Sequence, residues 1–112
     1  MKQYIDKDWL AENLNKTIGN SFIYFDTSST YYYFGVTNIE QINDVQFKVC
    51  YKFGIWIHQD GTIYANRKYT SDNTIRLGPD VRGSFFLVDN ETAMKDFNDK
   101  IYEFIKKENM VN

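Results

Sequence analysis

The most regular pattern in the chain is an alternation of hydrophobic and polar residues. Every second position is hydrophobic over one long run: Val45, Phe47, Val49, Tyr51, Phe53, Ile55 and Ile57. A period of two predicts a β-strand with one buried face. The run is longer than the usual strand of about five or six residues. It therefore predicts either one long bent strand or two strands that meet at Gly54, where a bend is easiest.

An Asp-Gly pair at residues 60 and 61 predicts a hairpin after this run. A two-residue loop would pair Ile57 with Tyr64 and mix the two faces. A three-residue loop over residues 59–61, with Gly61 left-handed, pairs Ile57 with Ile63 and sets Trp56 beside Tyr64. It leaves one face apolar, so we expect this register and a returning strand over about residues 62–69.

The rest of the segment between residues 20 and 88 is rich in Tyr, Phe, Ile, Val and Thr, which is typical of strands. Turn signals at residues 27–29 and 78–80 divide it. The further strands that we expect cover residues 21–26, 30–37, 74–77 and 82–88, with a polar connection over residues 38–44 and a loop over residues 70–73.

Helical spacing occurs at both ends of the chain. Ile5, Trp9, Leu10, Leu14 and Ile18 recur at this spacing, so we expect a helix over about residues 6–18, capped by Asp6 and ended by Gly19. A second helix should begin after Asp89 or Asn90. Its apolar stripe would consist of Met94, Phe97, Ile101, Phe104 and Ile105.

This order of elements predicts an α+β fold: an N-terminal helix, a curved antiparallel sheet of six or seven strands, and a C-terminal amphipathic helix. The 112 residues correspond to one domain, residues 1–112. The layout resembles pleckstrin-homology-like domains, in which the strands precede a closing C-terminal helix, and it also suits a barrel-like sheet. The leading helix departs from that pattern.

Composition removes several classes of function. Cys50 is the only cysteine and His58 the only histidine, so neither an intramolecular disulfide nor a typical zinc site can form. No segment has the roughly 18 apolar residues of a membrane span, and no phosphate-binding loop or nucleophile elbow occurs. We therefore expect a cytoplasmic protein that is not an enzyme and that holds no cofactor or metal.

The charges are spread unevenly around a formal net charge of −2. Residues 48–88 contain six basic and three acidic residues, which is +3, whereas residues 1–47 and 89–112 carry −3 and −2. A basic centre is a candidate contact for an acidic partner. The alternative is a chance distribution around two solvated acidic helices.

A candidate binding surface lies within this basic segment. All three arginines of the chain occur there, with lysine and aromatic residues beside them; the residues of this surface are Trp56, Tyr64, Arg67, Lys68, Tyr69, Arg76 and Arg82. Arginine and tyrosine are favoured at protein interfaces, and the same residue types bind single-stranded nucleic acid. Two alternatives stay open: the arginines could pair with Asp60, Asp72 and Asp80 of the same chain, and Trp56 could be a core residue.

These features predict a small binding protein without catalysis, an inhibitor or accessory factor that docks on an acidic surface of another protein. The abundance of Asn, Ile, Lys and Tyr, which have AT-rich codons, suggests an origin in a phage or mobile element. One alternative is a nucleic-acid-binding module that uses the basic central sheet. Another is a ligand-binding or enzymatic domain with a pocket in the curved sheet. The oligomeric state stays open.

Overall fold

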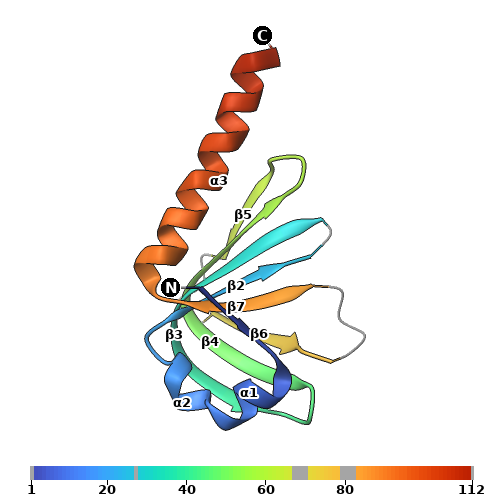
Figure 1. The fold of residues 1–112 in the computed structure, drawn as a ribbon, viewed down its shortest axis with the longest axis vertical. Coiled ribbons are helices and arrows are strands. Elements are labelled where there is room, and N and C mark those ends of the chain that lie inside the picture. Colours follow the sequence, from blue (N-terminus) through green and yellow to red (C-terminus); the bar gives the residue numbers. More distant parts are fainter. Residues whose placement is uncertain (1, 27, 67–70, 79–82, 112) are drawn as a thin grey trace.

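The computed structural model describes the backbone of residues 2–26, 28–66, 71–78 and 83–111, and the side chains of these residues except 66, 71–73 and 104–111. It contains seven strands and three helices (Figure 1). In chain order they are β1 (Lys2–Ile5), α1 (Lys7–Glu12), α2 (Leu14–Thr17), β2 (Ser21–Phe25), β3 (Ser29–Gln41), β4 (Gln46–His58), β5 (Ile63–Asn66), β6 (Ser71–Arg76), β7 (Ser84–Val88) and α3 (Asn90–Val111). The predicted α+β class is confirmed.

All seven strands form one antiparallel sheet with the order β1-β7-β2-β3-β4-β5, and β6 also pairs with β4. Two strands, β5 and β6, can pair with the same edge of β4 because β4 is long. One edge pairs with β3 along its length, while the other pairs first with β6 and then with β5. The sheet is open, with β1 and β5 at the two ends of its path. The finer expectation of a pleckstrin-homology-like or barrel-like arrangement stays a prediction.

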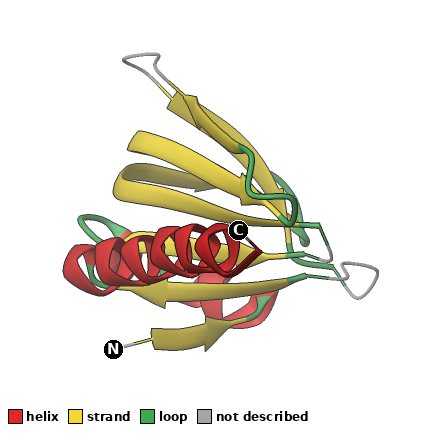
Figure 2. Cartoon of the chain, turned by 90° about the horizontal axis from the view of Figure 1, so that it is seen from above, coloured by secondary structure: helices red, strands yellow, loops and turns green. Residues whose placement is uncertain are grey.

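The two faces of the sheet bury two separate hydrophobic clusters. One cluster contains Leu10 of α1 and is continued by Leu14 of α2. The other contains Ala93 and is continued by Phe97 and Ile101, all from α3. We call these surfaces the α1 face and the α3 face. Figure 1 shows α1 and α2 at one end of the sheet, and Figure 2 shows α3 lying along one side of it.

The alternating run at residues 45–58 is one continuous strand that changes face. Val36 and its partner Tyr51 belong to the cluster on the α1 face, whereas Phe34 and Ile55 belong to the α3 face. The change coincides with Gly35, whose φ is +67°. Such a left-handed residue breaks the alternation of sides and is tolerated best by glycine. On β4 the change of face falls between Tyr51 and Ile55, a stretch that lies beside Gly35 and includes the expected position at Gly54.

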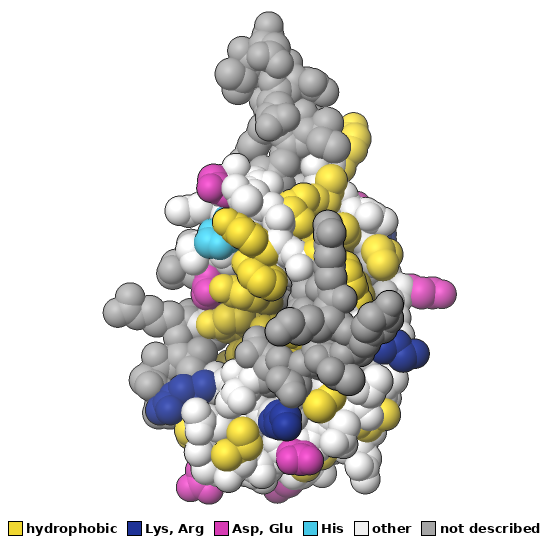
Figure 3. All heavy atoms as spheres, turned by 180° about the vertical axis from the view of Figure 1, so that it is seen from behind, with side chains coloured by type: hydrophobic (Ala, Val, Ile, Leu, Met, Phe, Trp, Pro, Cys, Tyr) yellow, Lys and Arg dark blue, Asp and Glu magenta, His cyan; other side chains and the backbone are white. Residues whose placement is uncertain are grey.

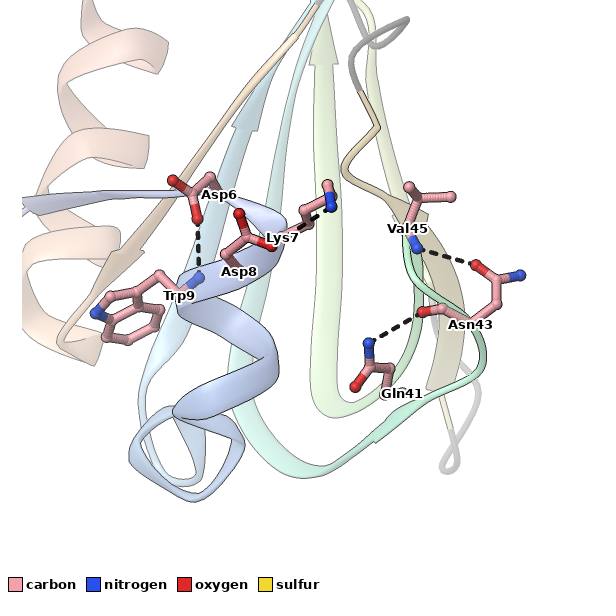
Figure 4. Close-up of polar contacts among 7 residues, drawn as sticks. All are labelled: Asp6, Lys7, Asp8, Trp9, Gln41, Asn43 and Val45. Carbon is pink, nitrogen blue, oxygen red and sulfur yellow. Dashed lines mark hydrogen bonds and ion pairs between the residues drawn. The ribbon is translucent and has the colours of Figure 1, made fainter.

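The N-terminal prediction was wrong in two respects. Residues 2–5 form strand β1, because Ile5 pairs with Phe85 and is buried. The helix starts where expected, since Asp6 accepts a hydrogen bond from the backbone N–H of Trp9 (Figure 4). It is interrupted at Asn13, whose side chain donates to the carbonyl of Trp9 at 2.7 Å and competes with the helical pattern.

Two segments expected as connections belong to strands. Residues 38–41 continue β3, because a bulge between Val36 and Asn38 returns Ile39 to the core. The actual turn is built by Asn43, whose side-chain oxygen accepts from the backbone N–H of Val45 (Figure 4). The same oxygen also accepts from the backbone N–H of Gln46. Likewise, residues 71–73 form the start of β6 through pairing with β4. Polar composition predicted loops, and non-local pairing overrode it.

The hairpin prediction is confirmed. Gly61 has a φ of +88°, and the N–H of His58 donates to the carbonyl of Thr62 at 2.9 Å, which closes the three-residue loop. Ile57 pairs with Ile63 and Trp56 with Tyr64. The start of the C-terminal helix is also where the sequence indicated, because Asp89 caps it.

Candidate binding surface

A row of five aromatic rings crosses the α1 face from β7 to β5. Each ring belongs to a residue directly opposite the next in the register of the sheet. Side chains at such positions lie close enough to interact. The row is Phe85 on β7, Tyr24 on β2, Tyr31 on β3, Trp56 on β4 and Tyr64 on β5. We call it the aromatic row.

The rings of the aromatic row stand upright on the sheet and stack side by side. Tyr24 and Phe85 have centroids 4.3 Å apart and planes 18° from parallel, and Trp56 and Tyr64 are 5.3 Å apart at 14°. The links through Tyr31 are looser, at 5.5 Å to Tyr24 and 6.0 Å to Trp56, with angles of 30° and 26°. Each such pair contributes about 0.5–1.5 kcal/mol beyond its buried area. The ring faces are therefore largely used within the row, and the ring edges point away from the sheet.

Exposure increases along the aromatic row. Phe85 is 3% exposed, Tyr24, Tyr31 and Trp56 are half-buried, and Tyr64 is 44% exposed. The reason is the position of the helices, since α1 and α2 lie at the opposite end of this face and α3 covers the other face (Figure 1). Within the described residues no helix covers Trp56 or Tyr64. Figure 3 shows hydrophobic side chains gathered beside the single histidine of the chain.

The polar surroundings of the aromatic row are turns held by aspartates. Asp60 accepts a hydrogen bond from the backbone N–H of Thr62, which lowers the pKa of its carboxyl. Partial burial, together with the nearby Asp26 carboxylate, raises the pKa of Tyr24. Tyr24 therefore stays protonated at neutral pH and keeps a hydroxyl that can donate a hydrogen bond. His58 lies at the end of the row, with its ring 5.2 Å from that of Tyr64.

The structure brings together only part of the candidate surface expected from the sequence. Trp56 and Tyr64 are stacked neighbours, and Trp56 is half-buried rather than a core residue because α3 covers the opposite face. Arg76 is exposed at the end of β6 opposite Gln46, ten residues along β4 from Trp56, or about 33 Å of extended strand. The remaining candidates lie outside the described residues: Arg67, Lys68, Tyr69 and Arg82.

Other candidate chemistry is not assembled. Cys50 and His58 lie eight residues apart on the same continuous strand, or about 26 Å when extended, so they form no catalytic pair. Among the described residues, no group of three or more His, Cys, Asp or Glu side chains is placed to hold a metal ion. Nor does the described part of the chain contain a helix long and apolar enough to span a membrane.

Comparisons with protein-family models, with curated protein sequences and with solved structures found no match to this chain.

Sequence reasoning missed three members of the aromatic row: Phe85, Tyr24 and Tyr31. The hairpin register did identify the pair of Trp56 and Tyr64, because both residues belong to one local turn. The pairing of Tyr24 with Phe85 joins residues 61 positions apart. The aromatic run at residues 31–33 was the only available signal, and it did not specify which ring shares a face with which strand.

Proposed function

We propose that this chain is a non-catalytic binding protein that docks the exposed end of the aromatic row, Trp56 and Tyr64, on another protein. The observation that carries the proposal is the stacked pair itself, which leaves Tyr64 44% exposed on the edge strand β5. Tyrosine and tryptophan are the residues most often found as interface hot spots. A rigid pair of rings also loses little conformational entropy on binding.

The orientation of the rings favours a protein over a nucleic acid. Single-stranded nucleic acid is bound by stacking its bases on open aromatic faces. In the aromatic row Trp56 lies between two rings, at 26° and 14°, and Tyr64 turns one face toward Trp56 and has the His58 ring edge-on beside it. What the row offers outward is ring edges and phenolic hydroxyls, which suit the carbonyl and carboxylate groups of a protein surface.

Three sequence-based predictions belong to this proposal. They are a role as an inhibitor or accessory factor, a cytoplasmic location, and an origin in a phage or mobile element. The acidic character of the partner rests on Arg67, Lys68 and Arg82, which lie outside the described residues. A pleckstrin-homology-like layout, in which a helix closes a curved sheet, is compatible with such a role and carries no further weight.

The test compares Tyr64→Ala with two matched controls. Tyr4 on β1 and Tyr102 on α3 are exposed tyrosines, at 61% and 67%, that lie outside the aromatic row. Each variant and the unmodified chain are used to capture partners from a lysate of the source cells, with and without nuclease, and the captured proteins are quantified by mass spectrometry. We expect one protein to be captured in stoichiometric amount by the unmodified chain, Tyr4→Ala and Tyr102→Ala.

Tyr64→Ala should reduce that capture about tenfold or more, as for an interface hot spot. Equal capture by Tyr64→Ala would show that the aromatic row is not the docking surface. Loss of all partners on nuclease treatment would replace the proposal by the nucleic-acid alternative. In that case, the affinity for a labelled oligonucleotide should fall steeply with salt concentration.

A further inference from the structure

A small pocket lies at the end of the sheet where the β2–β3 turn meets the β4–β5 hairpin. The two turns are joined by a hydrogen bond from the backbone N–H of Gln59 to the carbonyl of Ser28, at 2.8 Å. The pocket has a volume of about 180 Å³. This is below the range of about 300–1,000 Å³ for drug-sized ligands. It is lined by Asp26, Ser28, Ser29, Thr30, Ile57, His58, Gln59 and Lys100.

Ser29 in this pocket has an unsatisfied hydroxyl. The residue is only 5% exposed, and its Oγ is the one buried side-chain nitrogen or oxygen in the described part of the chain that has no hydrogen-bond partner. Such a group costs about 1–3 kcal/mol when it stays unpaired. Native proteins rarely leave one without a water, ion or ligand to bind it. The hydroxyl is therefore free to donate a hydrogen bond to an occupant of the pocket.

Asp26, the one carboxylate among the described residues that line the pocket, already has partners. Asp26 Oδ1 accepts hydrogen bonds from the backbone N–H groups of Ser28 and Ser29, at 2.8 and 2.7 Å, and from the hydroxyl of Ser28 at 3.1 Å. All three donors bind the same carboxylate oxygen and assign Asp26 to the turn. Asp26 thus shapes the pocket and does not compete strongly for a cation.

The other side chains are mostly donors. Lys100 reaches the pocket from α3, with its ammonium 4.9 Å from the ring centroid of Phe25. Within the described residues this ammonium forms no ion pair. His58 and Gln59 can donate through ring and amide N–H groups, and Ser29 through its free hydroxyl. The pocket therefore combines the Lys100 ammonium and several neutral donors with one carboxylate, Asp26, that is already bound within the turn.

We propose that this pocket binds a compact oxyanion, a carboxylate or a phosphate group. The ammonium of Lys100 supplies the charge, and Ser29 with the neighbouring donors of the hairpin supplies hydrogen bonds. Charge-assisted hydrogen bonds of this kind are the strongest available to a small anion. The pocket adjoins the aromatic row only at His58. Oxyanion binding can therefore be tested independently of the proposed protein partner.

The probe for this site is His58, because a single histidine gives one resolved set of imidazole signals in proton NMR spectra. The purified protein is titrated with inorganic phosphate, and separately with acetate, against sodium chloride at matched ionic strength and constant pH. We expect a saturable shift of the His58 signals with at least one oxyanion and no saturable shift with chloride. Shifts that rise linearly for all three salts would overturn the proposal.

Two variants identify the residues that bind. Lys100→Gln should weaken the oxyanion affinity about tenfold or more, whereas Lys95→Gln, an exposed lysine on the same helix, should leave it unchanged. Ser29→Ala should weaken it about threefold to tenfold. The same variant should not lower the stability of the unliganded protein, because it removes an unpaired hydroxyl. Unchanged affinity in Lys100→Gln, or in Ser29→Ala, would overturn the assignment.

The oxyanion has two sources, a free small molecule or an anionic group on a docked macromolecule. Saturable binding of free phosphate or acetate by the purified chain establishes the chemistry in either case. Competition then separates the sources: the oxyanion should displace a captured partner only if that partner places its own anionic group in the pocket.

Discussion

The phenolic ring of Tyr24 lies over Gly83, at the strand end next to the aromatic row. A Cβ atom at residue 83 would lie 2.1 Å from a ring carbon of Tyr24 and 2.4 Å from the carbonyl oxygen of Phe25. Rotation of the ring can relieve only the first of these contacts, because the second involves the backbone. Gly83 therefore allows the stack of Tyr24 on Phe85 to sit close to the sheet.

Replacing Gly83 should destabilise the fold. We expect Gly83→Ala to lower the free energy of unfolding by about 1–3 kcal/mol, the usual cost of overpacking, as measured by urea denaturation. In a Tyr24→Ala background, Gly83→Ala should lower the free energy of unfolding by less than it does in the unmodified chain. Part of the loss should persist, because the clash with the Phe25 carbonyl remains. A denaturation midpoint of Gly83→Ala equal to that of the unmodified chain would contradict this packing.

A partly buried hydrogen bond attaches α3 to the sheet. The hydroxyl of Tyr32 donates to Asp96 Oδ2 at 2.6 Å, and Tyr32 is fully buried. Asp96→Ala should therefore lower the free energy of unfolding by about 1–3 kcal/mol, because it leaves a buried hydroxyl without an acceptor. Asp99→Ala, an exposed position on the same helix, is the control and should have little effect.

The double variant Tyr32→Phe with Asp96→Ala tests the origin of this loss. Removal of both partners should be less costly than Asp96→Ala alone, because no polar group then stays unsatisfied. If the two single losses simply add, the hydrogen bond does not couple the helix to the sheet.

The same tyrosine should make the fold sensitive to alkaline pH. Burial first, and the hydrogen bond to Asp96 second, raise the pKa of Tyr32 well above its ordinary value of about 10. The unfolded chain releases this proton near pH 10 and the folded chain does not. The contribution of Tyr32 to stability should thus be constant below that pH and fall above it, by up to about 1.4 kcal/mol per pH unit.

Urea denaturation of the unmodified chain and Tyr32→Phe at several pH values around 10 measures this effect. The decline should be shallower in Tyr32→Phe, although Tyr24, whose pKa is also raised, keeps a part of it. Parallel curves for the two proteins would assign the alkaline loss to other residues.

The start of α3 should respond to acid instead. The backbone N–H of Thr92 donates to Asp89 Oδ1 at 2.6 Å, and this bond, together with a side-chain hydrogen bond from Thr92, contributes most to lowering the pKa of Asp89 to about 2. A lowered pKa stabilises the fold above the ordinary value of about 3.9. This contribution is lost as the pH falls from about 4 to about 2.

Asp89→Asn keeps an oxygen that can cap the helix but does not titrate. The variant should lose less helical signal than the unmodified chain between these pH values, as followed by far-ultraviolet circular dichroism. Asp99→Asn, which caps no helix, should behave like the unmodified chain. Identical acid transitions in all three proteins would argue against Asp89 as the cap.

Local sequence determined the parts of this protein that depend on neighbouring residues. The alternation at residues 45–58 predicted β-structure over this whole run, as one long bent strand or as two strands. The requirement for one apolar face specified the hairpin in which Trp56 meets Tyr64. Asp6 and Asp89 likewise marked helix starts, because a cap is satisfied within three residues.

Only the tertiary structure decided the contacts between residues that are far apart in the sequence. The insertion of β7 between β1 and β2 brings Phe85 beside Tyr24 and completes the aromatic row, and the approach of α3 to the β2–β3 turn brings Lys100 to Ser29. Residues 38–41 and 71–73 became strands because β3 and β6 pair with β4 there. Hydrogen bonding between strands and side-chain burial outweigh local preference, and neither is encoded by the spacing of residues along one segment.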